Sequence, residues 1–140
     1  MKSGPIILIE DDADDEDIFE EVLADLQIPN RLIWFTNADE AFIYLKKTPE
    51  QPFIIFSDVN IPGKSGIEFK RMIDSDPVLR KKSIPFVFYS TVADQPTVNE
   101  AYVHLTVQGF FKKSNSYGET RNTIGMILEY WKTCRHPNTF

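Results

Sequence analysis

Short apolar segments alternate with longer amphipathic segments along the whole chain. The apolar segments are rich in Ile, Val and Phe and show little alternation with polar residues, which is typical of strands buried on both faces of a sheet. They predict strands at residues 5–10, 31–36, 52–58, 84–90 and 109–111. The segments between them carry apolar residues at helical spacing and predict helices at residues 14–26, 38–47, 67–76, 95–107 and 117–134.

Capping residues and apolar faces add detail to these helices. Asn37 is a suitable N-cap for the second helix, and Pro49 follows its end. A frayed tail is expected near His136. The side chains expected to point inward are Ile18, Val22, Leu23 and Leu26 in the first helix, and Ile124, Ile127, Leu128 and Trp131 in the last.

The alternation of strand and helix, repeated five times, predicts an α/β fold with one parallel sheet covered by helices on both sides. A length of 140 residues fits one domain spanning residues 1–140. In such doubly wound sheets, ligands bind outside the carboxyl ends of the strands. The residues that follow each apolar segment are therefore the candidates for function.

Composition narrows the classes of partner. The chain is 42% hydrophobic and 26% charged, with a net charge of −6, which argues against nucleic acid because its binding rests on basic patches. No apolar segment is long enough to span a bilayer, and the first residues lack the layout of a signal peptide. Cys134 is the single cysteine, so no internal disulfide is expected, and a reducing compartment, the cytoplasm, is predicted.

Polar residues follow four of the five predicted strands. The first strand is followed by Glu10, Asp11 and Asp12, the third ends at Asp58, the fourth at Ser90, and the fifth is followed by Lys112 and Lys113. Carboxylates are oxygen ligands that Mg²⁺ takes, and a central aspartate can act as nucleophile toward a phosphoryl group. A lysine can hold a phosphoryl oxygen and a serine can donate to another. Together they suit phosphoryl transfer, which needs positioning and charge neutralisation.

Seven acids lie within the eight positions 10–17. Like charges at this density repel, so they need either solvation at a helix start or a cation. Glu10 and Asp11 directly follow a buried strand and are interpreted as metal ligands. Asp14, Asp15 and Asp17 are interpreted as a solvated helix N-terminus, where the helix dipole favours negative charge.

Four segments, in this order and at this spacing, resemble the receiver domain of two-component response regulators of the CheY type. These segments are ILIEDD, FIIFSDVNIPGKSGIEF, IPFVFYST and GFFKKS. The C-terminal segment ILEYWKTCRHPN and the long acidic entry to the first helix resemble single-domain cyanobacterial phytochrome response regulators. The resemblance implies a flavodoxin-like sheet with strand order 2-1-3-4-5, and a phosphoacceptor switch rather than an enzyme.

The resemblance also implies a metal site and a phosphoacceptor. Asp58 would accept the phosphoryl group. Asp11 would bind Mg²⁺ directly, with Mn²⁺ as an alternative ion, and Glu10 would act mainly through water. The backbone carbonyl of Asn60 would be a further ligand.

The remaining implied roles concern the switch. Ser90 would be the switch hydroxyl, Lys113 would contact the phosphoryl group, and Phe110 would be the switch aromatic. Pro62 and Gly66 match the loop after the acceptor, and the glycine would free the backbone to enter the next helix.

Several positions depart from the family pattern or offer a competing residue. Ser114 replaces the usual proline after the lysine, Thr91 replaces a smaller residue and is expected to slow hydrolysis of the acyl phosphate, and Phe110 lacks a hydroxyl. Asp12 is a third acid beside Asp11. Lys112 competes with Lys113, but neighbours on a strand point to opposite sides, so only one can face the site.

The resulting hypothesis is a phosphorylation switch. A sensor histidine kinase or a phosphotransfer protein would donate to Asp58, and no output domain is expected in residues 1–140. Output would then be binding, to a downstream protein or to a second copy through the helix at 95–107, the strand at 109–111 and the last helix. Without metal, the charges of Glu10 and Asp11 are expected to raise the pKa of Asp58.

Three other functions compete with this hypothesis. A degenerate receiver could act as a phosphorylation-independent adaptor. A flavodoxin-like cofactor binder would need hydroxyls and glycines in the first turn, which here contains EDDAD. A metal-dependent phosphatase with an aspartyl nucleophile would need a second acid at position 60, which is Asn.

Overall fold

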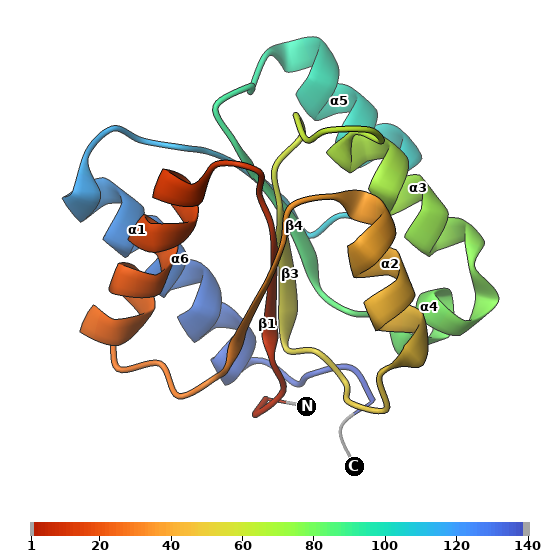
Figure 1. Ribbon diagram of the computed structural model, residues 1–140, viewed down its shortest axis with the longest axis horizontal. Helices are drawn as coiled ribbons and strands as arrows, with labels where there is room; N and C mark the ends of the chain where they lie inside the picture. Colours follow the sequence, from red (N-terminus) through yellow and green to blue (C-terminus); the bar gives the residue numbers. More distant parts are fainter. Residues whose placement is uncertain (1, 139–140) are drawn as a thin grey trace.

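The computed structural model describes residues 2–138 and contains a five-stranded parallel sheet with helices on both faces (Figure 1). The strand order is β2-β1-β3-β4-β5, as predicted, and every neighbouring pair is parallel. The strands are β1 (Ile6–Ile9), β2 (Leu32–Phe35), β3 (Ile54–Ser57), β4 (Phe86–Ser90) and β5 (Gly109–Lys112).

The helices form two layers on the two faces of the sheet. One layer contains α1 (Ala13–Asp25) and α6 (Tyr117–Thr133), and the other contains α2 (Ala38–Lys47), α3 (Gly66–Ser75), α4 (Pro77–Lys82) and α5 (Gln95–His104) (Figure 1). No helix within residues 2–138 is both long enough and apolar enough to cross a bilayer.

Alternate residues of the strands supply two separate cores. In β1, Ile7 and Ile9 face the layer with α2 and α3, whereas Ile6 and Leu8 face the layer with α1 and α6. All four side chains are at most 3% exposed, so each contributes roughly 1.5–3 kcal/mol of burial free energy. This burial of both faces explains the nearly unbroken apolar character of the strands.

The short helix α4 was not predicted from the sequence. Asp76 caps it by accepting from the backbone N–H groups of Val78 and Leu79 at 2.9 and 3.0 Å, and Pro77 occupies its first position. Ser83 ends it in the left-handed conformation, with φ of 52°. A helix of six residues is too short to show an apolar period, so its cap residues are its main signal.

The predicted faces of the first and last helices need one correction. Ile18 is 38% exposed, whereas its neighbour Phe19 is 2% exposed and packs edge-on against Phe56. The prediction for Ile18 was wrong because the buried stripe of α1 runs through positions 16, 19, 22 and 23. In α6, Ile124 is fully buried as predicted, and Trp131 packs at the edge of the core. The Asn37 cap is confirmed, since its side chain accepts from Glu40 N at 2.9 Å.

Residues 135–138 pack against the protein, although a frayed tail was expected near His136. His136 is 5% exposed, its Nε2 lies 2.6 Å from the carbonyl oxygen of Phe53, and its ring stacks on the Phe53 ring at 5.4 Å. Asn138 donates through Nδ2 to the carbonyl oxygens of Lys81 and Lys82 at 3.2 and 2.7 Å. The segment therefore ties the end of α6 to β3 and α4, at the amino ends of the strands.

Candidate functional site

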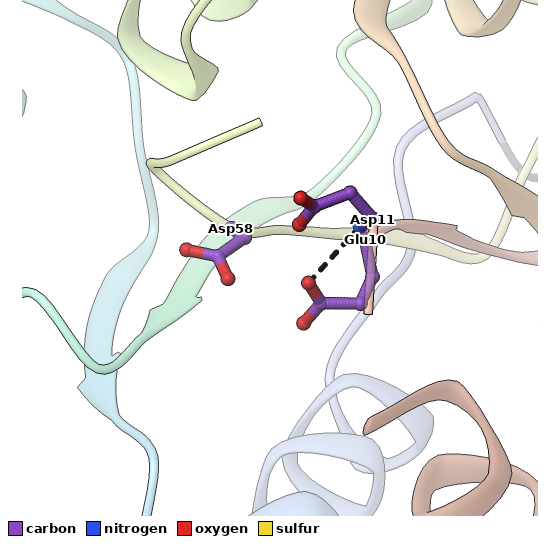
Figure 2. Close-up of side chains that lie close together, drawn as sticks. All are labelled: Glu10, Asp11 and Asp58. Atoms are coloured by element: carbon purple, nitrogen blue, oxygen red, sulfur yellow. Dashed lines mark hydrogen bonds between the residues drawn. The ribbon is translucent and has the colours of Figure 1, made fainter. Parts of the chain in front are cut away.

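The carboxyl ends of β1 and β3 bring three carboxylates together. Ile9 pairs with Ser57 in the sheet, and Asp58 N donates to Ile9 O at 3.0 Å, so the residues after each strand are neighbours. Oxygen atoms of Glu10, Asp11 and Asp58 all lie within 4.8 Å of one another, and Figure 2 shows the three side chains side by side. Three hard oxygen donors at this spacing suit a divalent cation such as Mg²⁺.

Asp58 is held by donors on both carboxylate oxygens. Its Oδ1 accepts from the backbone N–H groups of Val59 and Asn60 at 2.6 and 3.2 Å and from Ser90 Oγ at 2.6 Å. Its Oδ2 accepts from Lys113 Nζ at 2.9 Å. The residue is only 8% exposed, so its position and charge are set by the protein rather than by water.

Lys113 supplies the ammonium group that contacts the carboxylates of the site. Its backbone N–H donates to Ser90 O at 2.9 Å, which continues the sheet beyond β5. Its side chain is 8% exposed, and its Nζ contacts carboxylate oxygens of Glu10, Asp15 and Asp58. Lys112 is exposed. The structure thus places Lys113, and not Lys112, at the acids. The alternation predicted that only one of the two lysines faces the site, and the resemblance to receiver domains indicated Lys113.

The proton affinities of the two buried carboxylates diverge. Burial raises the pKa of Glu10 to about 7; the hydrogen bond and charge of Lys113 oppose this rise, and the charge of Asp58 adds to it. Burial also acts to raise the pKa of Asp58, but hydrogen bonds from Lys113 and Ser90 and the Lys113 charge outweigh it, and the net pKa lies below the ordinary value. The predicted rise at Asp58 was therefore wrong: the like-charge effect falls on Glu10.

The third acid of the first loop has a structural role. Asp12 is the N-cap of α1, and its Oδ1 accepts from the backbone N–H groups of Asp14 and Asp15 at 2.8 and 3.4 Å. The Glu10 carboxylate accepts from Asp11 N at 3.1 Å, the bond drawn in Figure 2. Asp12 is thus engaged in capping, and Asp11 is the acid that shares the site with Glu10.

Asp15 was missed by the sequence analysis, which treated it as part of a solvated helix start. Its Oδ2 lies 2.9 Å from Lys113 Nζ. A signal was present in the sequence, because positions 15, 19 and 22 follow helical spacing and the last two are buried core residues. An acid on that stripe faces inward.

The loop after Asp58 approaches the site closely at Gly66. A Cβ atom on Gly66 would lie 2.1 Å from the backbone oxygen of Asp58 and 3.0 Å from Val59 Cα. Gly66 N also donates to Val59 O at 2.8 Å. The glycine is therefore required by close contact rather than by conformational freedom, which corrects the predicted reason.

The remaining predicted positions lie on β5 or just after β4 and β5. Phe110 is half-buried, with its ring 5.4 Å from that of Phe88. Thr91 is exposed directly after the fully buried Ser90. The peptide between Lys113 and Ser114 is trans, and Ser114 Oγ donates to Glu119 Oε2 at 2.6 Å.

The chain is similar to proteins of one family over most of its length. Residues 6–124 match the family model described as response regulator receiver domain. The chain is 28% identical over 131 residues to response regulator Rcp1 of Synechocystis sp., covering 90% of this chain and 87% of that protein.

Two solved structures illustrate the similarity. The phosphorylated cyanobacterial phytochrome response regulator RcpA has a TM-score of 0.85 and 28% identity, with 96% of this chain and 98% of that chain covered. The Mn²⁺-bound form of response regulator Rcp1 has a TM-score of 0.81 and 26% identity, with the same shares covered.

Proposed function

The chain belongs to the response regulator receiver domain family, and we propose that it is a phosphorylation switch whose phosphoacceptor is Asp58. One observation carries the proposal: the Asp58 carboxylate lies beside the acid pair Glu10 and Asp11 and accepts hydrogen bonds from Ser90 and Lys113. An ionised carboxylate with a lowered pKa, held by such donors, is a prepared nucleophile for phosphoryl transfer.

The proposed transfer takes place between a phosphohistidine and Asp58. A lone pair on an Asp58 carboxylate oxygen attacks phosphorus and forms an O–P bond. The P–N bond to the imidazole of a sensor histidine kinase or a phosphotransfer protein breaks, and its electron pair leaves with the imidazole nitrogen. Lys113, now donating to Asp58 Oδ2, and Ser90, now donating to Oδ1, turn to the new phosphoryl oxygens.

The acids fit a divalent cation as the cofactor. Glu10, Asp11 and Asp58 supply oxygen atoms within 4.8 Å of one another, and we propose that they hold Mg²⁺, or Mn²⁺, together with the Asn60 backbone carbonyl and water. The bound cation would neutralise charge on the phosphoryl oxygens. The Mn²⁺-bound structure of Rcp1, which is 26% identical to this chain, supports the assignment.

The proposed output is a change in binding. Phosphorylation adds roughly −1.5 to −2 charge, and the movement of Ser90 and Lys113 toward it would repack Phe110, whose ring lies 5.4 Å from that of Phe88. The surface of α5, β5 and α6 carries exposed apolar side chains, including Tyr102, Val103, Met126 and Tyr130. This surface would bind a downstream protein or a second copy of the chain, in the cytoplasm, where the free thiol of Cys134 is suited to the reducing conditions.

Mass spectrometry of the intact protein tests the proposal. The native protein and the variants Asp58→Asn and Asp14→Asn are each incubated with Mg²⁺ and acetyl phosphate. The expected result is one added phosphoryl group in the native protein and in Asp14→Asn, and none in Asp58→Asn. An absence of any adduct in the native protein, or an undiminished adduct in Asp58→Asn, would refute the assignment, and the former would favour the phosphorylation-independent adaptor.

A further inference from the structure

Three carboxylates share the one ammonium group of the site. Lys113 Nζ contacts Glu10 Oε1, and it lies 2.9 Å from both Asp15 Oδ2 and Asp58 Oδ2. An ammonium has three N–H donors, so each is already engaged. Glu10 and Asp58 follow strands, whereas Asp15 comes from the first turns of α1. Among the carboxylates that contact Lys113 in residues 2–138, Asp15 is the one that does not belong to the group of Glu10, Asp11 and Asp58, which suits a cation.

We propose that Asp15 is a positioning residue that holds Lys113 toward α1 and competes with the phosphoryl group for its ammonium. The inference rests on the proposed function, because it concerns the same phosphorylation of Asp58. It goes further because it proposes that one residue of α1 lowers the affinity of Lys113 for the phosphoryl group.

The competition follows from the number of donors on Lys113. A phosphoryl oxygen can be bound only if one N–H leaves its present acceptor. Asp58 loses its negative charge when it becomes an acyl phosphate, and Glu10 belongs to the proposed cation site. Asp15 has neither role, so its contact with Lys113 would persist and draw the ammonium away from the phosphoryl oxygens.

The surroundings of Asp15 allow it to act in this way. The Lys113 side chain is 8% exposed and that of Asp15 is 37% exposed, so the ion pair lies at the edge of the site, where water screens it only in part. The backbone N–H of Asp15 donates to Oδ1 of the N-cap residue Asp12 at 3.4 Å, which anchors Asp15 to the start of the helix. A cavity of about 30 Å³ lies beside the pair and is bordered by Tyr89 and Ser114, so the pair is not fully enclosed by neighbouring side chains.

Removal of the Asp15 charge should therefore strengthen binding of a phosphoryl mimic. We expect Asp15→Asn, which keeps the shape of the side chain, to bind fluoroberyllate about three- to tenfold more tightly at saturating Mg²⁺. The affinity for Mg²⁺ alone should fall or stay unchanged, because a negative charge near the cation is lost. If the substitution only loosened the structure of the site, both the fluoroberyllate affinity and the Mg²⁺ affinity would fall.

The experiment titrates the full-length protein with fluoroberyllate and follows tryptophan fluorescence. Trp34 is a local reporter, since its indole N–H donates to Glu10 O at 2.6 Å. The matched control is Asp14→Asn, which removes one charge from the same helix turn, where Asp14 is exposed. Asp15→Glu restores the charge and should return the affinity toward that of the native protein. Asp15→Ser serves as a second variant if Asp15→Asn does not fold.

The outcomes separate the two proposals. Tighter binding in Asp15→Asn, with Asp14→Asn within twofold of the native protein, supports the role of Asp15. Equal shifts in both variants, or weaker binding in Asp15→Asn, overturn it. Failure of the native protein to bind fluoroberyllate, or unchanged binding in Asp58→Asn, would instead refute the phosphoacceptor assignment.

Discussion

Replacement of Gly66 by alanine tests whether the start of α3 is fixed by contact with the backbone of Asp58 and Val59. The new Cβ would lie 2.1 Å from the Asp58 carbonyl oxygen, 3.0 Å from its carbonyl carbon and 3.0 Å from Val59 Cα. All three are backbone atoms, so no flexible side chain can move aside. The clash can be relieved only if the helix start or the Asp58 segment shifts.

The expected cost combines two effects. Overpacking at a well-packed position costs about 1–3 kcal/mol, and a shift of the helix start would weaken the 2.8 Å hydrogen bond from Gly66 N to Val59 O, which contributes about 0.5–1.5 kcal/mol. The free energy of unfolding should therefore fall by about 2–4 kcal/mol. For a domain of this size the melting temperature should drop by roughly 6–15 °C.

Two other glycines provide matched controls in urea and thermal unfolding. Gly63→Ala meets no atom within 4 Å but sits at φ of +77°, so only the left-handed conformation is penalised, by about 1–2 kcal/mol. Gly118→Ala lies in α6 with its nearest contact at 3.8 Å, and helix propensity should make it more stable by about 0.5–1 kcal/mol. If Gly66→Ala proved as stable as Gly63→Ala, the contact argument would be wrong.

Three further predictions concern stability and lifetime. Burial and neighbouring carboxylates raise the pKa of Glu16 to about 7, so the free energy of unfolding should fall as pH rises from 4.5 to 7. In urea unfolding at pH 8, Glu16→Gln should have a free energy of unfolding about 1 kcal/mol above that of the native protein, and at pH 5 the two should be equal. The exposed control Glu21→Gln should show no such gain. Burial lowers the pKa of His136, so its contribution to the free energy of unfolding should be present above pH 6.5 and should decrease as the pH falls below that value. At pH 8, His136→Ala should lower the free energy of unfolding by about 1–3 kcal/mol, and an unchanged urea midpoint would contradict this. Thr91→Ala should shorten the lifetime of the acyl phosphate several-fold in timed mass measurements, and an equal lifetime would remove the shielding role of the exposed Thr91 side chain.

The strands and long helices could be predicted because burial on both faces leaves a direct mark on the sequence. Residues 86–89 are fully or almost fully buried and alternate between the two cores, so each must be apolar. The helix over residues 38–47 was predicted with its observed bounds, because Asn37 begins it and polar residues with a proline follow it. Local chemistry and packing indicate the same structure in these segments.

Elements that depend on distant partners were missed. Residues 77–82 form α4 through a local cap and a single buried side chain, Leu79, which leaves no period to detect. His136 is buried because Phe53, more than eighty positions earlier, offers a carbonyl and a ring. Such contacts depend on the tertiary fold, and neighbouring residues do not specify them.

The sequence named several residues that the structure brings together, but it did not indicate Asp15 or the distribution of charge. Topology alone brings the ends of β1, β3 and β4 together, so Asp58, Ser90 and the acid pair could be named from the places where apolar segments end. The sequence does not reveal how far each carboxylate is buried or which one the ammonium contacts most. The pKa prediction for Asp58 failed for this reason, since the Lys113 and Ser90 donors outweigh its acidic neighbours.

The charge balance of the site explains why the cation and the phosphoryl group are expected to act together. Glu10, Asp15 and Asp58 contact the Lys113 ammonium, and Asp11 lies beside Glu10 and Asp58, so four carboxylates face one ammonium group and negative charge is in excess. Under the proposed function, a phosphoryl group on Asp58 would bring more negative charge. A divalent cation on the acid pair and an ammonium freed from Asp15 could offset it, so both the metal and the partner of Lys113 should set how long the phosphoryl group stays on Asp58.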